Sequence, residues 1–344
     1  MTAAAAGSAP ATAPAPQTPA RPRAGAGLAI ARFVALRIVG LVATLIVASI
    51  VIFGALYLAP GSPLTFLTHG RTMTPQAIAS LKHEYHLDEP VYQQYWHWFS
   101  GALHGDFGTS ILYHESVGSL IANRAVNTVV LVLFSAVIIV VIGLALGILT
   151  GLRPGWLSNA LIGLATGAMA IPAFVAAVVL TLLFGVDLGW FPTFGPGSGF
   201  GDRLYHLTLP AIALALASVA FVARLTQAAV REELAAEHVQ TAISRGLPYR
   251  FVVRRHVLRN AAIPMVTVGG LTVAGLLAGS VVVEQVFQLN GLGSYLVTSV
   301  QQKDFPVVQA ICLVYVATFI VLNTLIDVAY SLLDPRIAVG RSGS

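Results

Sequence analysis

Residues 128–151 read TVVLVLFSAVIIVVIGLALGILTG and include no charged side chain. So long an apolar run is typical of a transmembrane helix, because roughly 20 helical residues cross the ~30 Å hydrocarbon layer of a bilayer. Gly143, Gly147 and Gly151 recur every four residues, a spacing that lets helix backbones approach closely in lipid. The stretch therefore predicts a membrane-spanning helix packed tightly on a neighbour.

The whole chain has the composition of an integral membrane protein. Of its 344 residues, 56% are hydrophobic and only 10% are charged, which is too few to cover soluble domains of that length. The net charge is +5, but the basic residues are dispersed between apolar runs and form no patch for nucleic acid. Cys312 has no second cysteine to pair with, so we expect a buried thiol.

Five further apolar stretches are long enough to span a bilayer, at residues 38–58, 157–184, 207–227, 263–283 and 307–333. Together with residues 128–151 they predict six spans, which puts both chain ends on one side of the membrane. Most of the 19 lysines and arginines fall on that side. The positive-inside rule assigns it to the cytoplasm.

The N-terminal residues 1–31 are rich in Ala and Pro, a composition that predicts a disordered cytoplasmic tail. Arg32 and Arg37 stand at the start of the first span. A signal peptide also begins with positive charge, but its apolar core holds only about 7–15 residues. An uncleaved first span is therefore favoured over a signal peptide.

An outer segment, residues 60–127, follows the first span and is too long for a simple turn. Its aromatic residues include Tyr85, Tyr92, Tyr95, Trp96, Trp98 and Phe99. Amphipathic rings are favoured at the headgroup level, so the segment predicts helices lying on the membrane surface. A folded cap packed on the spans is the alternative interpretation.

Motifs for several chemistries are missing from the sequence. There is no G-x-x-x-x-G-K-[ST] loop to hold ATP phosphates, no H-E-x-x-H and no G-x-S-x-G. The sequence therefore indicates neither a P-loop ATPase, nor a metalloprotease with H-E-x-x-H, nor a serine protease with G-x-S-x-G. Ion-coupled transport needs ionisable groups at mid-membrane, whereas Glu284 and Asp327 fall near the ends of their spans.

Residues 241–264 join the fourth and fifth spans and read TAISRGLPYRFVVRRHVLRNAAIP. The run from Arg224 to Arg245 holds good helix formers without Gly or Pro, so we expect the fourth span to continue into the cytoplasm as one helix. Gly246 is placed to end that helix and Pro248 to open a second one at residues 249–262. The sequence predicts a helix, a sharp turn and a helix.

The arginines of this segment form like-charged pairs one helical turn apart, Arg250 with Arg254 and Arg255 with Arg259. Such pairs cost roughly 0.2–0.5 kcal/mol each unless an acidic group neutralises them. The internal candidates for that group are Glu232, Glu233 and Glu237, and the external candidate is a partner protein. Orientation of the loop and contact with anionic lipid are the simpler roles.

The stretch QTAISRGLPYRFVVRRHVLRNAAIP, residues 240–264, resembles the cytoplasmic EAA loop of type I ABC importer permeases, in the version found in dipeptide and oligopeptide permeases. The glycine of the family matches Gly246, its small residues match Thr241 and Ala242, and Gln240 replaces the acid that opens the general motif. The R-H-x-L-R-N-A-x-I-P stretch of the peptide subfamily is matched by Arg255, His256, Leu258, Arg259, Asn260, Ala261, Ile263 and Pro264.

Further motifs of that family follow in order along about residues 32–337. L-D-x-P and G-D-[LF]-G-x-S are carried by Leu87, Asp88, Pro90, Gly105, Asp106, Phe107, Gly108 and Ser110. E-x-x-F, G-x-G and D-[YF]-P are carried by Glu284, Phe287, Gly291, Gly293, Asp304, Phe305 and Pro306. The end of the chain resembles that of the family at Asn323, Asp327, Tyr330, Asp334, Pro335 and Arg336. Ser62 replaces the acid of the family's P-G-D-P.

The resemblance implies an all-α integral membrane protein with the six transmembrane helices of the type I ABC importer permease fold. A cytoplasmic coupling helix and an extracytoplasmic helical segment after the first span belong to that fold. The expected organisation is a tail at 1–31, the first span with the extracytoplasmic segment at 32–126, the permease core at 127–337, and a cytoplasmic tail at 338–344. The expected location is the bacterial cytoplasmic membrane, with both termini in the cytoplasm.

The same resemblance implies a permease subunit of an ATP-driven peptide importer, which is not itself an enzyme. A second homologous permease would complete the pathway, two ATP-binding subunits would hold ATP and Mg²⁺, and an extracytoplasmic binding protein would deliver the substrate. Membrane lipid is the remaining partner, and this chain would bind no cofactor and no nucleic acid. Nickel, glutathione and haem are the other cargoes of the family. The alternatives are a stand-alone ion-coupled secondary transporter and a membrane anchor for an enzyme complex.

The resemblance also assigns candidate site residues, with no catalytic residue and no metal ligand among them. Contact with the ATP-binding subunits is expected at Gln240, Thr241, Ala242, Arg245, Gly246, Leu247, Arg250, Arg254, Arg255, His256, Arg259, Asn260 and Pro264. The candidates for the pathway or its gate are Glu284, Phe287, Asn323 and Asp327.

Overall fold

The computed structural model describes residues 26–58, 74–84 and 87–333 of the chain. These residues form helices and connecting loops, with no strand among them and one isolated bridge between Thr109 and Ser116. The predicted all-α fold is confirmed. Residues 1–25 and 338–344 of the two predicted tails lie outside the described residues, as do the motif positions Ser62, Asp334, Pro335 and Arg336.

Five helical segments are long and apolar enough to cross a membrane. They are α1 (Ala26–Leu58), the continuous run α5 (Val117–Ile138), η1 (Ile139–Gly143) and α6 (Leu144–Leu152), then α9 (Phe200–Ala235), α12 (Leu258–Phe287) and α14 (Phe305–Leu333). The helix α1 already begins inside the tail predicted for 1–31. The boundary predicted between residues 126 and 127 falls within α5.

The third predicted span, 157–184, is broken into two helices. α7 (Trp156–Met169) is followed by α8 (Ala173–Leu180) and the π-helix η2 (Thr181–Asp187), and the two parts are bent by 105°. Pro172 stands at the break with an extended backbone (φ −59°, ψ 143°). Proline lacks an N–H and disfavours helix in the residue before it. The described residues therefore include five candidate spans, or six if the bent pair makes one crossing.

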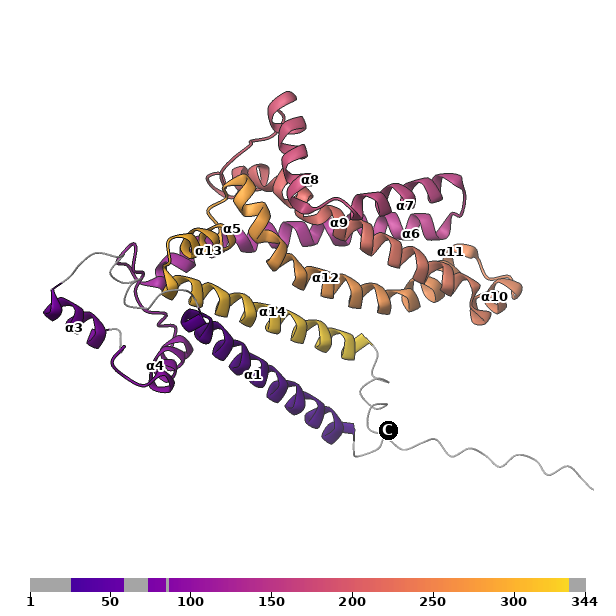
Figure 1. Cartoon of the computed structure of the whole chain (residues 1–344). Helices are drawn as coiled ribbons and strands as arrows, with labels where there is room; N and C mark the ends of the chain where they lie inside the picture. Colours follow the sequence, from indigo (N-terminus) through magenta and orange to yellow (C-terminus); the bar gives the residue numbers. More distant parts are fainter. Residues whose placement is uncertain (1–25, 59–73, 85–86, 334–344) are drawn as a thin grey trace, which may run out of the picture.

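The short helices gather at the two ends of the long ones (Figure 1). α3 (Pro75–Glu84), α4 (Val91–Leu103) and α13 (Leu292–Gln301) lie at one end, and α10 (Glu237–Ser244) and α11 (Tyr249–Val252) lie at the other. The first turn of α1 and the last turn of α14 lie at the end that carries α10 and α11. The start of α1 and the end of α14 therefore lie at the same end of the helices, as the predicted even number of membrane crossings requires.

The aromatic outer helix α4 combines the two interpretations of its sequence. Tyr95 bonds Ser49 of α1 (2.8 Å between the hydroxyl oxygens), and the rings of Tyr95 and Trp98 pack on Phe53. Tyr92 and Trp96 remain exposed on the other side of the helix. One face of α4 is therefore a cap on α1, and the other is free to meet lipid. The predicted position of Tyr85 lies outside the described residues.

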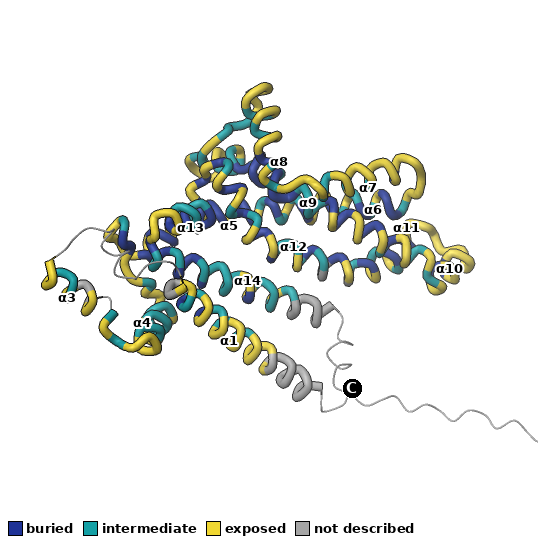
Figure 2. Tube along the Cα trace, in the orientation of Figure 1, coloured by how far each residue is buried: buried dark blue, intermediate teal, exposed yellow. Residues whose placement is uncertain are grey.

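The core of the protein is built around α9. Buried residues concentrate where α9 meets α5, α6, α8 and α12 (Figure 2), and they include Leu131, Ile139, Leu207, Leu214 and Val222. A separate outer cluster joins α5, α13 and α14, and an inner cluster lies under α10 and α11. Cys312 of α14 is a free thiol that is half-buried, so the expected burial is only partial.

The four-residue glycine spacing of the second span serves helix packing, as predicted. A Cβ atom on Gly143 would lie 3.0 Å from Val222 Cγ1, one on Gly147 would lie 2.6 Å from the Ala223 carbonyl oxygen, and one on Gly151 would lie 2.8 Å from Val230 Cβ. Such distances leave no room for a side chain. The small residues set how closely the second span can approach α9.

We expect Gly147→Ala to destabilise the protein by about 1–3 kcal/mol, because the added methyl group overpacks the contact with α9. Thermal unfolding of the purified protein in detergent measures the effect. Gly163→Ala is the matched control, since Gly163 is also helical but a Cβ atom added to it would meet no atom within 4 Å. Equal melting temperatures for the two variants would contradict the packing role.

Candidate functional site

The helix that leaves the fourth span breaks at Ala236, so the predicted single helix from Arg224 to Arg245 was wrong. Ala236 adopts an extended conformation (φ −63°, ψ 142°) between α9 and α10. The break lets α10 turn its apolar side inward, where Val239 and Ala242 are buried against Val252 and Ala261. Tertiary packing here overrides a local preference for straight helix.

The turn after α10 has the predicted glycine at its centre. Gly246 has a positive φ of 78°. Its N–H donates to the Ile243 carbonyl (2.9 Å), and the N–H of Leu247 donates to the Ala242 carbonyl (3.3 Å). These two bonds form a Schellman motif, which satisfies the last carbonyls of the helix. The prediction of a helix stop at this glycine is confirmed.

The second helix of the segment continues directly into the fifth span. α11 begins at Tyr249 as predicted, directly after Pro248, and the chain then runs through the π-helix η3 (Val253–Val257) into α12. Pro264 therefore lies inside α12 and does not end a helix. We call residues 236–260 the projecting segment.

The projecting segment has a buried underside and an exposed outer side. Its exposed apolar residues are Ile243, Leu247, Tyr249 and Phe251, and its exposed basic residues are Arg245, Arg250, Arg254, Arg255 and Arg259. Gln240, Thr241 and Asn260 are exposed as well, while Ala242 is buried and His256 is half-buried.

None of those five arginines forms an ion pair within the part of the chain that the structure describes. The predicted internal partners do not reach them, and Glu233 instead contacts His238 (3.4 Å) and Asn260 (3.3 Å). Because like charges one turn apart repel, the exposed side of the projecting segment is suited to an acidic partner outside this chain.

Glu284 of α12 is buried against the N-terminus of α13. Its carboxylate accepts hydrogen bonds from Thr128 Oγ1 (2.8 Å), Gly293 N (2.7 Å) and Ser294 N (3.1 Å). Thr128 Oγ1 in turn accepts from Leu292 N (2.8 Å). An anionic group is stabilised at a helix N-terminus, where the first N–H groups lack partners. This arrangement ties α5, α12 and α13 together.

The G-x-G motif is explained by the same carboxylate. A Cβ atom on Gly291 would collide with Glu284 Oε2, and one on Gly293 would lie 3.0 Å from it. Phe287 is also buried, and its carbonyl accepts from Gly195 N (3.0 Å). The structure thus gives Glu284 and Phe287 packing roles inside this chain, and a role in a gate stays a prediction.

Asn323 lies beside a cavity of about 530 Å³ between α1, α12 and α14. Arg37, Thr44, Gly275 and Phe319 also line this cavity. The Asn323 amide donates to the Phe319 carbonyl (2.8 Å), so at least one of its N–H groups is used within its own helix. The side chain of Asp327, one turn further along α14, is not among those that the structure describes.

Two sequence motifs far apart in the chain meet at a second buried carboxylate. Asp304 accepts hydrogen bonds from Ser110 Oγ and from the backbone N–H of Ile111 (3.2 Å).

Nearby, the Arg124 guanidinium lies 3.9 Å from the centre of the Tyr295 ring. Burial raises the pKa of Tyr295 to about 12, against the opposing effect of Arg124. The hydroxyl of Tyr295 therefore stays neutral at physiological pH.

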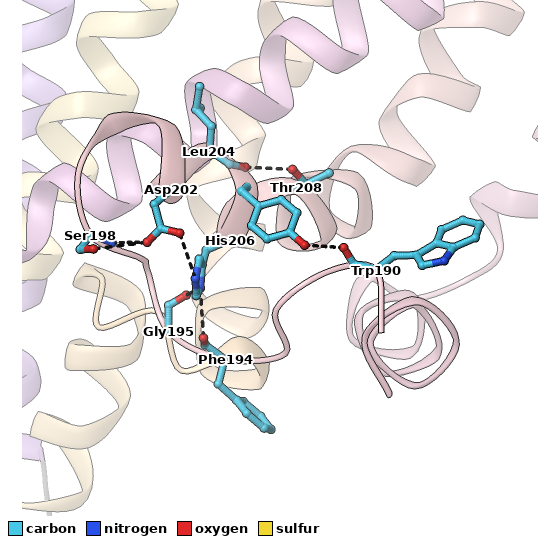
Figure 3. Close-up of polar contacts among 9 residues, drawn as sticks. Trp190, Phe194, Gly195, Ser198, Asp202, Leu204, His206 and Thr208 are labelled. Carbon is cyan, nitrogen blue, oxygen red and sulfur yellow. Dashed lines mark hydrogen bonds and ion pairs between the residues drawn. The ribbon is translucent and has the colours of Figure 1, made fainter. Parts of the chain in front are cut away.

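The loop between η2 and α9 is folded back on α9 by polar contacts that the sequence motifs did not indicate. Figure 3 shows Asp202 between Ser198 and His206, with Asp202 Oδ2 accepting from Ser198 N (2.6 Å). His206 Nδ1 faces the Gly195 carbonyl oxygen (3.1 Å), and Tyr205 donates to the Trp190 carbonyl (2.6 Å). The i, i+4 spacing of Asp202 and His206 was the available signal. The loop holds exposed aromatic rings at Trp190 and Phe194, and Phe200 at the start of α9 is exposed as well.

We expect Thr128→Val to lower the free energy of unfolding by about 1–3 kcal/mol for each buried group it leaves unpaired, namely Leu292 N–H and one oxygen of Glu284. Thr128→Ser keeps the hydroxyl and should lose less. Thr318→Val is the control, because among the described residues the Thr318 hydroxyl bonds just the Val314 carbonyl of its own helix. Thermal unfolding that ranks Thr128→Val no lower than Thr318→Val would refute this role.

Comparison with known proteins gives relatives over most of the chain. The family described as "Binding-protein-dependent transport system inner membrane component" matches residues 143–339, and the family of the corresponding N-terminal part matches residues 30–133. The glutathione transport system permease protein GsiC of Escherichia coli (strain K12) is 37% identical over 306 residues, which cover 89% of this chain and 98% of the relative.

The same protein from Shigella flexneri serotype 5b gives the same identity and coverage. Among solved structures, the inward-facing MetNI methionine ABC transporter covers 62% of this chain and 96% of its own, with a TM-score of 0.49 and 19% identity. The motifs recognised in the sequence lie within the matched residues. The chain therefore belongs to the family of binding-protein-dependent transport system inner membrane components and is a permease subunit of an ABC importer.

Proposed function

We propose that this permease serves an importer of short peptides. Two observations support a peptide cargo: the relatives that match 89% of the chain are named as glutathione permeases, and residues 255–264 carry the loop pattern of peptide permeases. The buried polar contacts of the described spans join helices of this chain to one another, as those of Ser158 with Thr150 and Gln227 do. Selection would then rest with an extracytoplasmic binding protein.

The observation that carries the coupling to ATP is the projecting segment. It has a fixed shape, exposed apolar side chains and five arginines without an internal partner, and such a surface suits a second protein. In our proposal the ATP-binding subunits dock there, against the residues from Gln240 to Asn260 named above and Pro264. These subunits hold ATP and Mg²⁺, and this chain has no ATP site of its own.

The remaining parts of the assembly follow from the same proposal. A second homologous permease completes the pathway, and a binding protein docks at the end that carries α3, α4 and α13. The end that carries α10 and α11 lies in the cytoplasm together with both termini, since most basic residues fall there. ATP-driven closure of the nucleotide-binding subunits would move the projecting segment and, through it, α9 and α12.

We expect the affinity-purified chain to bring down a second permease and ATP-binding subunits encoded with it. Proteoliposomes that hold this complex should take up labelled tripeptides only with ATP and the binding protein present, and addition of an ionophore should leave uptake unchanged. A stand-alone secondary transporter would give the opposite pattern, with uptake that needs no ATPase and collapses with the ionophore.

We expect Gly246→Val to lower ATP-driven uptake by roughly fivefold to thirtyfold, because a left-handed residue with a Cβ costs about 1–2 kcal/mol. A Cβ atom added at this position would meet no atom within 4 Å, so the cost comes from φ alone. Gly246→Asn is the control, since asparagine tolerates positive φ. Undiminished uptake with Gly246→Val would show that the turn geometry does not matter for coupling.

A further inference from the structure

α9 and α10 meet at an angle at Ala236, which we call the corner. No residue that usually breaks a helix stands there. The sequence around Ala236 is LAAEHVQ, with no Gly and no Pro, and its residues favour continuous helix. Ala236 nevertheless takes an extended conformation with ψ of 142°. Contacts between side chains must therefore hold the two helices at this angle.

Polar contacts cross the corner from three helices. Glu233 of α9 lies 3.4 Å from His238 Nε2 of α10 and accepts from Asn260 Nδ2 of α12 (3.3 Å). The Asn260 and His238 nitrogens are 3.2 Å apart, so the three side chains meet in a triangle in which His238 Nε2 either donates to Glu233 or accepts from Asn260. The His256 ring lies next to this triangle, 6.3 Å from the ring of His238 between centroids.

Gln240 makes a separate bond across the same corner. Its Nε2 donates to the carbonyl oxygen of Leu234 (2.8 Å), one of the last carbonyls of α9 and one that the break leaves without a helical partner. A carboxylate at this position could not donate this bond, and it would place a negative charge at the negative end of the α9 dipole. The glutamine thus has a physical reason to stand where the general motif has an acid.

Apolar packing supports the corner from below. Val239 is fully buried together with Val230, Val252 and Val257. The polar contacts lie on the solvent side and the apolar contacts lie underneath, so a change of angle would have to break both sets.

We propose that Glu233, His238, Gln240 and Asn260 are positioning residues that lock the angle between α9 and α10, so that the projecting segment transmits movement to the spans without bending at Ala236. This proposal rests on the coupling role assigned to the projecting segment. The angle stays fixed through the transport cycle, and these side chains act on uptake through α10, not through the substrate.

One substitution distinguishes an angle that stays fixed during transport from an angle that changes. A residue before proline is restricted to extended conformations with ψ near 120–160°, and proline is favoured at the first position of a helix. Glu237 is the first residue of α10, and Ala236 before it already has ψ of 142°. Glu237→Pro therefore suits the observed corner and forbids a straight helix.

Proteoliposomes with the full complex and the binding protein then measure peptide taken up per ATP hydrolysed. We expect Glu233→Ala and Gln240→Glu each to lower this ratio by roughly twofold to tenfold, the range for loss of a hydrogen bond or two. Glu232→Ala should match the wild type, since Glu232 is an adjacent exposed glutamate outside the triangle. Glu237→Pro should retain wild-type uptake and restore the ratio when combined with Glu233→Ala.

Rescue by the proline separates positioning from general stability, because proline restores no lost contact. Loss of uptake in Glu237→Pro would show that the corner straightens during the cycle and would overturn the proposal. An unchanged ratio in both Glu233→Ala and Gln240→Glu would overturn it as well.

Hydrogen exchange of the α10 amides in the purified permease tests whether these residues hold the angle between α9 and α10, and it needs no transport assay. Exchange should be faster in Glu233→Ala and Gln240→Glu than in Glu232→Ala, and equal rates would count against the corner. If the wild-type complex shows no ATP-driven uptake, the proposed function fails, while the exchange rates still decide whether these residues hold the angle.

Discussion

Close contact between the second span and α9 is the constraint on which the rest of this structure depends. Lipid tails are apolar, so burying an apolar side chain between two helices in a bilayer gains little hydrophobic free energy. Helices therefore associate through tight van der Waals contact of small residues. Gly143, Gly147 and Gly151 provide that contact along three turns. α8 and α12 pack on other sides of α9, and these helices together form one continuous core.

At the outer end, two buried carboxylates organise the loops. Glu284 joins α12, α13 and α5, and Asp304 joins the start of α14 to the loop after α4. Each one accepts backbone N–H groups that would otherwise be buried without a partner, a loss that costs about 1–3 kcal/mol per group. These bonds connect the loops at the end where a binding protein is proposed to dock.

At the inner end, the same chain offers a surface that it does not use itself. The buried underside of the projecting segment is continuous with α9 and α12, whereas its outer side presents arginines and aromatic rings to solvent. A rigid body with an unsatisfied outer side is what transmission of force from a partner requires. In the proposed function, the ATP-binding subunits dock on that outer side.

The sequence by itself determined the membrane character, most of the spans, the turn at Gly246 and the family, because apolar run length, glycine at positive φ and ordered motifs are local signals. Only the tertiary structure decided the break at Ala236 and the burial of Glu284, whereas Pro172 was a local signal for the bend in the third span. Helix propensity could not anticipate Ala236, since the break depends on Val239 and Gln240 meeting residues from other helices. In the same way, motif matching found Glu284 and Asp304 but not their contacts with Thr128 and Ile111, because these partners lie more than 150 residues away along the chain.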